Sequence, residues 1–114
     1  MSDAFFQKFL NDPASREARD WLKSGTGNTL GELDSAEESL AIVDNAYAAG
    51  AIKVIAVEID NYGEFQNTGK LIIELPKAAE KRASVFAWAA PIAESQGYDG
   101  EEDEGQPYLF LMLD

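Results

Sequence analysis

The residues of this chain best suited to chemistry are the carboxylates of one acidic loop. Residues 99–104 contain five of them, namely Asp99, Glu101, Glu102, Asp103 and Glu104. Hard cations bind carboxylate oxygens, so we compared the spacing with that of an EF-hand calcium loop. With Asp99 at position 1, Gly105 falls at position 7 and Phe110 at position 12, where a bidentate Glu is required. We therefore assign no metal ligand, and interpret the loop as a solvated connection with partner docking as the alternative.

A second set of carboxylates surrounds the central strands. Glu58 and Glu74 lie on neighbouring predicted strands, and two carboxylates that share a buried cleft can act as acid and base. The ordinary interpretation places both near strand ends in water, so we assign no catalytic residue. The chain also has no His and no Cys, which removes the commonest general base, thiol nucleophiles and the usual zinc ligands. The composition favours a non-catalytic protein without a cofactor over an enzyme.

The charge balance bears on the kind of partner. The chain has 21 acidic and 9 basic residues, for a net charge of −12. Because phosphate groups repel such a chain, we expect no nucleic-acid partner, whereas a basic protein would be attracted. No stretch approaches the ~20 apolar residues of a membrane span, and the start lacks the features of a secretory signal. We expect no membrane partner and a cytoplasmic location.

The order of elements after residue 28 predicts the fold class. Strands are expected at residues 29–33, 52–59, 70–75 and 108–113, with helices between Ser35 and Gly50 and over residues 77–96. This βαββαβ order is typical of a ferredoxin-like α+β fold, with a four-stranded antiparallel sheet and two core helices on one face. Residues 1–28 are expected to be an N-terminal helical extension, and residues 29–114 the ferredoxin-like domain, together one structural unit.

Local signals define the ends of these helices. Ser35 and Glu38 have the spacing of a capping box, and Gly50 suits the residue after a helix. Pro91 is expected to kink or break the second core helix, because proline removes one backbone hydrogen bond. Within the extension, Pro13 follows a break, and the glycines at positions 25 and 27 predict a turn.

Two of the predicted strands, at residues 52–59 and 108–113, carry apolar side chains on both faces, which implies that both faces of the sheet are covered. The face away from the helices is expected to display Val54, Ile72, Tyr108, Phe110 and Met112. Two covers are considered for this face. One is the N-terminal segment with Phe5, Phe6, Phe9, Trp21 and Leu22; the other is a second copy in a homodimer, or a different partner.

The predicted loop between the central strands contains two aromatic residues, Tyr62 and Phe65. Exposed aromatic side chains are enriched at contact sites, although these two could instead fold back over the core. With the acidic loop, they form the candidate partner contact. Our first hypothesis is a non-catalytic protein-binding or regulatory module, for example an immunity-type or inhibitor protein that acts against a basic partner. The alternatives are a dimeric α+β barrel that binds or transforms a small molecule at the second sheet face, and a structural subunit that pairs through that face.

Overall fold

The computed structural model describes residues 3–24 and 27–113 of the 114-residue chain. Residues 25 and 26 of the turn predicted from the glycines at positions 25 and 27 therefore lie outside the described residues. Four helices are described: α1 (Asp3–Leu10), α2 (Ala18–Lys23), α3 (Ala36–Ala49) and α4 (Ala79–Ser95). The strands are β1 (Arg16–Glu17), β2 (Thr29–Leu30), β3 (Lys53–Val57), β4 (Asp60–Asn61), β5 (Gln66–Thr68), β6 (Lys70–Glu74) and β7 (Tyr108–Met112).

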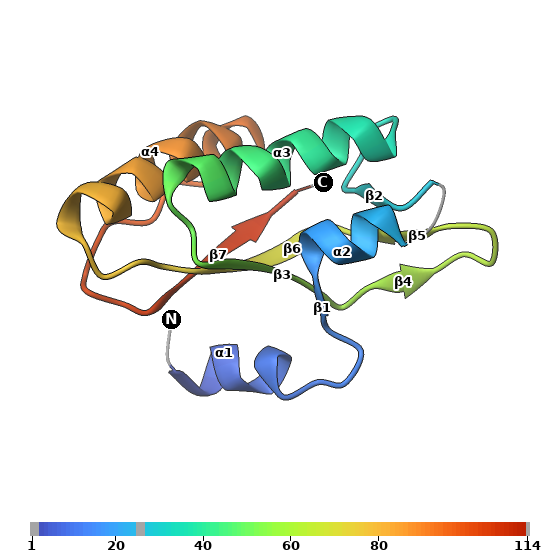
Figure 1. Ribbon diagram of the computed structural model, residues 1–114, viewed down its shortest axis with the longest axis horizontal. Helices are drawn as coiled ribbons and strands as arrows, with labels where there is room; N and C mark the ends of the chain where they lie inside the picture. Colours follow the sequence, from blue (N-terminus) through green and yellow to red (C-terminus); the bar gives the residue numbers. More distant parts are fainter. Residues whose placement is uncertain (1–2, 25–26, 114) are drawn as a thin grey trace.

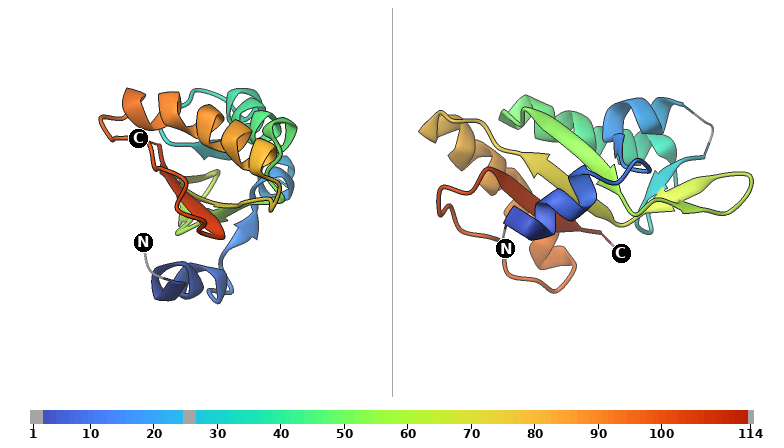
Figure 2. Two further views of the ribbon diagram at one scale, coloured as in Figure 1. Left: turned by 90° about the vertical axis from the view of Figure 1, so that its left-hand side faces the viewer. Right: turned by 90° about the horizontal axis from the view of Figure 1, so that it is seen from below.

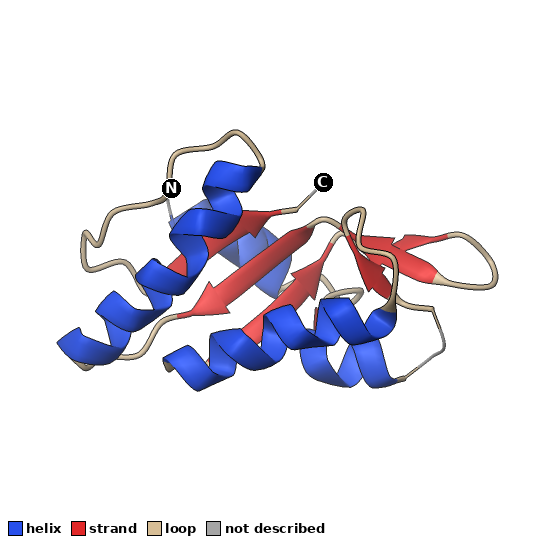
Figure 3. Ribbon diagram, turned by 90° about the horizontal axis from the view of Figure 1, so that it is seen from above, coloured by secondary structure: helices blue, strands red, loops and turns tan. Residues whose placement is uncertain are grey.

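The strands form two sheets. The larger sheet is antiparallel, with the order β1-β3-β6-β7, and the smaller one has the order β2-β5-β4. Helices α2, α3 and α4 lie on one side of the larger sheet and α1 lies on the other (Figures 1 and 2). The smaller sheet continues from one end of β6, because only Gly69 separates β5 from β6 (Figure 3). The predicted α+β class is confirmed.

The ferredoxin-like strand order is not clearly present. In the split βαβ arrangement the first strand lies inside the sheet, whereas here Thr29 and Leu30 pair in parallel with β5 and β7 pairs directly with β6. The segment predicted as a five-residue strand forms only the two residues of β2 and joins the smaller sheet. Gly31 adopts a left-handed φ of 53°, and the Leu33 N–H donates to the Leu30 carbonyl at 3.1 Å, so the strand ends in a turn. Residues 16–17 supply the fourth strand instead, beside β3.

The ends of α3 follow the predicted signals. Ser35 Oγ accepts the Glu38 N–H at 3.1 Å, and Gly50 follows the helix with a φ of 122°. The predicted break at Pro91 is wrong, since α4 runs through this residue. Pro91 and Ala87 are both exposed, so water can bond the Ala87 carbonyl that loses its helical partner.

The larger sheet is buried on both faces, by different parts of the chain. The first core lies under α2, α3 and α4 and includes Val54, Leu71 and Leu111, whereas the second lies under α1. The buried members of the second core are Phe6, Phe9, Ile55, Val57 and Ile72, with Phe5, Leu10, Tyr108 and Phe110 packed against them. The placement of Val54 on the second face is therefore wrong, because the β3–β6 register pairs Val54 with Ile73 and Ile55 with Ile72.

The N-terminal segment covers both faces of the sheet. Phe6 is 2% exposed, its ring lies 5.4 Å from that of Tyr108, and the Phe5 ring meets Phe110 edge-on at 5.2 Å. Trp21 and Leu22 were expected on this second face, but α2 places them in the first core. The reason is that β1, which lies between α1 and α2 in the chain, pairs with β3, so the chain changes sides at the sheet edge.

Among the described residues, no helix is both long and apolar enough to cross a membrane.

The packing of α1 predicts a stability effect. Phe6→Ala should lower the free energy of unfolding by about 3 kcal/mol, because it removes a buried aromatic side chain and leaves a cavity. Denaturant titration measures this change. Gln7→Ala is the matched control, since Gln7 is exposed on the same helix and should change stability little. Equal stability of the two variants would show that α1 does not hold the second face.

Candidate functional site

The carboxylates of the central strands are not paired with each other. Glu58 forms an ion pair with Lys70, and Glu74 lies opposite Lys53 in the sheet register. Since Lys70 and Glu74 are at opposite ends of β6, the two carboxylates lie at opposite ends of the β3–β6 pair. They cannot work as an acid–base dyad. Within residues 3–24 and 27–113, no three carboxylates come together in a group that could hold a metal ion.

Two carboxylates of the acidic loop have structural partners. Arg82 Nη2 donates to Asp103 Oδ1 at 2.7 Å and to the Gln106 carbonyl at 2.9 Å. The hydrogen bond from Arg82, aided by the Gly105 N–H, holds the pKa of Asp103 below its usual value. Glu101 Oε2 accepts the Phe110 N–H at 3.0 Å. These contacts attach the loop to α4 and β7.

The remaining carboxylates of the loop face solvent. Asp99, Glu102 and Glu104, three of the candidate partner contacts, are exposed.

The hairpin between β4 and β5 presents the two predicted aromatic contacts. Tyr62 is 59% exposed and Phe65 is 42% exposed, so neither ring is buried in the core. The two rings stack on each other, with centroids 5.1 Å apart and planes inclined by 19°. Tyr62 and Phe65 are called the aromatic pair below. The two stacked rings cover part of each other's apolar surface but still offer a large apolar area to a partner.

The hairpin is held in one conformation by its backbone. The Tyr62 N–H donates to the Phe65 carbonyl at 2.9 Å, and the Gly63 N–H donates to Asn61 Oδ1 at 2.9 Å. Gly63 has a φ of 92°, which glycine adopts without a Cβ clash. The turn therefore brings the two rings together.

The base of the hairpin is attached to α2. Trp21 Nε1 donates to Gln66 Oε1 at 3.0 Å, and the Gln66 N–H donates to Asn28 Oδ1 at 3.2 Å. The buried Asn28 in turn donates from Nδ2 to the Trp21 carbonyl at 2.9 Å. Three residues that are distant in sequence thus form a closed network, and the aromatic pair stands on a fixed support.

The surface next to Phe65 is acidic. Two hollows adjoin this ring, and their linings include Asp34 and Glu64. No Lys or Arg is among the lining residues in the described part of the chain. A partner that covers the aromatic pair would therefore meet negative charge at its edge.

The residues predicted on the second sheet face have three different environments. Ile72, Tyr108 and Phe110 pack under α1, and Val54 lies in the first core. Met112 is half-buried beside a cavity. A second copy could reach this face only if α1 were displaced.

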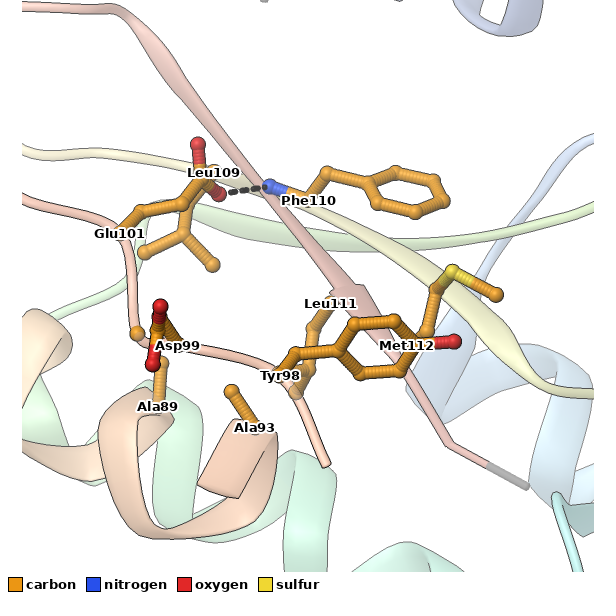
Figure 4. Close-up of a pocket in the computed structure, with 10 residues that line it drawn as sticks. Ala89, Ala93, Tyr98, Asp99, Glu101, Leu109, Phe110, Leu111 and Met112 are labelled. Atoms are coloured by element: carbon orange, nitrogen blue, oxygen red, sulfur yellow. Dashed lines mark hydrogen bonds between the residues drawn. The ribbon is translucent and has the colours of Figure 1, made fainter. Parts of the chain in front are cut away.

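The cavity beside Met112 lies between α4 and β7 and has a volume of about 250 Å³. Figure 4 shows Ala89 and Ala93 of α4 on one side of it and β7 on the other. Its lining is Ala89, Ala93, Tyr98, Asp99, Gly100, Glu101, Leu109, Phe110, Leu111 and Met112. Sequence analysis did not predict this cavity. Alanine at positions 89 and 93, one helical turn apart, is the only local signal, since small side chains leave room beside a strand.

A polar cluster that the sequence did not predict joins β1, α2, α3 and β3. Tyr47 Oη donates to Glu17 at 2.5 Å and accepts the Val54 N–H at 2.9 Å. Glu17 also accepts the Asp20 N–H at 2.7 Å, which caps α2, and Arg19 lies 4.4 Å above the Tyr47 ring. Burial, together with the hydrogen bond to Glu17, raises the pKa of Tyr47 to about 12. Because these groups satisfy one another, we assign the cluster to stability.

The described residues thus define a compact α+β protein with an exposed aromatic hairpin and an apolar cavity beside an edge strand. Comparison with models of known families, with curated proteins and with solved structures found no match. The function is therefore argued from these surfaces alone.

The Tyr47 cluster predicts a pH-dependent effect on stability. At neutral pH, Tyr47→Phe should lower the free energy of unfolding by about 1 kcal/mol, because Glu17 and the Val54 N–H lose a partner. Between pH 10 and about 12 the unfolded tyrosine ionises while the folded one stays neutral, so this group's contribution falls as pH rises. The difference between the wild type and the variant should shrink over that range in denaturant titrations. A difference that is constant with pH would contradict this assignment. Because the other tyrosines are present in both proteins, their ionisation does not affect the difference.

Proposed function

We propose that this protein is a non-catalytic protein-binding module that docks a basic partner protein through the β4–β5 hairpin. The observation that carries the proposal is the aromatic pair, which is exposed, stacked and rigidly supported. An inhibitor or immunity-type role is the specific form that we favour, because such proteins act by occupying a partner's surface.

The energetics of the aromatic pair support a contact role. Tyr and other aromatic residues are enriched among interface residues that dominate binding energy. Burial of the two rings under a partner would remove apolar surface from water. The turn and the network at the hairpin base already restrict the conformation, so little entropy is lost on binding. The hairpin therefore suits a preformed binding surface.

Charge supports the basic nature of the partner. Asp34 and Glu64 lie next to the aromatic pair, and the whole chain has a net charge of −12. Such a surface attracts a basic protein over a distance and repels an acidic one. The attraction weakens as salt screens it, so the complex should have a strong dependence on ionic strength.

The alternative, a dimer or small-molecule site on the second sheet face, receives less support. Phe6 and Phe9 of α1 occupy that face, and a barrel-like dimer would have to remove them from a buried core. The cavity beside β7 includes Phe110 and Met112 from the expected pocket, but it opens beside the strand rather than over the sheet face.

The proposal is tested by removal of the aromatic pair. The wild-type protein is immobilised and incubated with a lysate of its source at low and high salt, and bound proteins are identified by mass spectrometry. We expect basic proteins to be retained at low salt and released at high salt. The double variant Tyr62→Ala/Phe65→Ala should weaken binding of the captured partner at least tenfold, since hot-spot truncations cost about 2 kcal/mol or more.

Ile52→Ala is the matched control for this experiment. Ile52 is 54% exposed and lies before β3, outside the hairpin. Ile52→Ala removes exposed apolar surface elsewhere on the protein and should leave partner binding unchanged. A partner that binds the double variant as tightly as the wild type, or that binds equally at both salt concentrations, would refute the proposal.

A further inference from the structure

The outer side of β7 is an unpaired sheet edge. Among the described strands, in the order β1-β3-β6-β7, this strand has a neighbour on one side only. The Leu75 N–H donates to the Pro107 carbonyl and the Leu113 N–H donates to the Gly69 carbonyl, so the odd-numbered positions face β6. Antiparallel pairing alternates these directions, and the N–H and carbonyl groups of Tyr108, Phe110 and Met112 therefore point outward.

One of these outward groups is occupied by a side chain. The Phe110 N–H donates to Glu101 Oε2 at 3.0 Å (Figure 4). A carboxylate in this position satisfies the donor and places negative charge on the strand, two devices that discourage unwanted pairing of edge strands. Glu101 thus occupies the position that the carbonyl of an added strand would take.

The apolar cavity lies along the same edge. Its lining includes Leu109 and Leu111 of the first core and also Phe110, whose ring packs under α1. Successive residues of β7 thus border one cavity, as expected for a cavity that lies beside the strand. At about 250 Å³ it is smaller than the roughly 300–1,000 Å³ of ordinary ligand pockets. It suits one apolar side chain better than a drug-sized molecule.

The charge at the cavity identifies the kind of occupant. Asp99 and Glu101 contribute carboxylates to its lining, and no Lys or Arg is among the lining residues of the described chain. A second copy that paired through β7 about a two-fold axis would bring the two Glu101 side chains towards each other, and like charges on facing strands repel. A basic segment would instead find complementary charge.

We propose that the outer edge of β7 binds an extended basic segment of a partner protein as an additional β-strand. One apolar side chain of the segment enters the cavity between α4 and β7, and a neighbouring Lys or Arg lies beside Asp99 and Glu101. Main-chain hydrogen bonds supply affinity, and the cavity and the carboxylates supply specificity. This surface is separate from the β4–β5 hairpin.

Binding requires an exchange at Phe110. A carbonyl of the added strand accepts the Phe110 N–H, and the Glu101 carboxylate is released to pair with the cation of the segment. The Phe110 N–H therefore has an acceptor both before and after binding, and an ion pair is gained. The exchange makes Glu101 a specificity-determining residue for basic segments.

The test uses a synthetic peptide of eight residues that alternates Lys with Val and carries one central Leu. We expect the peptide to shift the amide NMR signals of Phe110 and Met112 and to protect the Met112 N–H from hydrogen exchange. A peptide of the same sequence that is N-methylated at alternate residues cannot pair with the edge, so its affinity should fall at least tenfold. An analogue with Glu in place of Lys should not bind.

Protein variants locate the peptide. Ala93→Leu fills the cavity and Glu101→Gln removes one charge while it keeps a hydrogen-bond acceptor; each should weaken binding at least fivefold. Glu101→Gln should also reduce the salt dependence of the affinity, which a merely structural role would not do. The double variant Tyr62→Ala/Phe65→Ala should bind the peptide normally, so failure of the hairpin proposal and failure of this one are distinguishable.

Three outcomes would overturn the inference. These are no binding at millimolar peptide, equal affinity for the N-methylated peptide, and NMR shifts confined to residues outside β7 and the cavity. Sedimentation analysis addresses the second copy: a dimer that protects the Met112 N–H and excludes the peptide would assign the edge to self-association instead.

Discussion

Burial of the central strands from both sides is the constraint on which the structure depends. Val54 and Ile73 face α2, α3 and α4, while Ile55 and Ile72 face α1. Removal of either layer would expose a row of aliphatic side chains to water, at a cost of about 25 cal/mol per Å² of apolar surface. A chain of this length must therefore use its N-terminal segment as a cover, and β1 is the point at which the segment passes from one face to the other.

This arrangement explains where the two proposed interaction surfaces lie. Helices α2, α3 and α4 cover one face of the larger sheet and α1 covers the other, but the helices do not cover the outer edge at β7. The β4–β5 hairpin extends beyond the covered region (Figures 1 and 3). Arg82 holds the loop before β7 through Asp103 and the Gln106 carbonyl, and Glu101 attaches the loop to the strand through the Phe110 N–H. The uncovered parts are consequently rigid, since each is attached to the core by specific hydrogen bonds.

The sequence predicted those features that depend on short-range physics. The Ser35 cap, Gly50 and the strand character of β3, β6 and β7 follow from spacing and alternation within a few residues. The exposed aromatic pair was predicted as a candidate because it lies in a polar loop. The sequence did not decide which side chains of β3 face the helices. Apart from Lys53 at its start, the strand is apolar on both sides, so the alternation of polar and apolar residues is weak, and the prediction for Val54 is wrong.

Features that join distant segments could not be predicted from these short-range patterns. The Tyr47–Glu17 hydrogen bond and the Trp21–Gln66–Asn28 network depend on which strand lies beside which. The cavity is a further case, because it exists only where the small side chains of α4 meet an edge strand. Residues 29–33 turn away at Gly31 and pair with β5 instead of entering the larger sheet, so β7 pairs directly with β6. The short β2 and the direct β6–β7 pairing thus have the same cause, the turn at Gly31, which could not be predicted from the apolar residues of the segment.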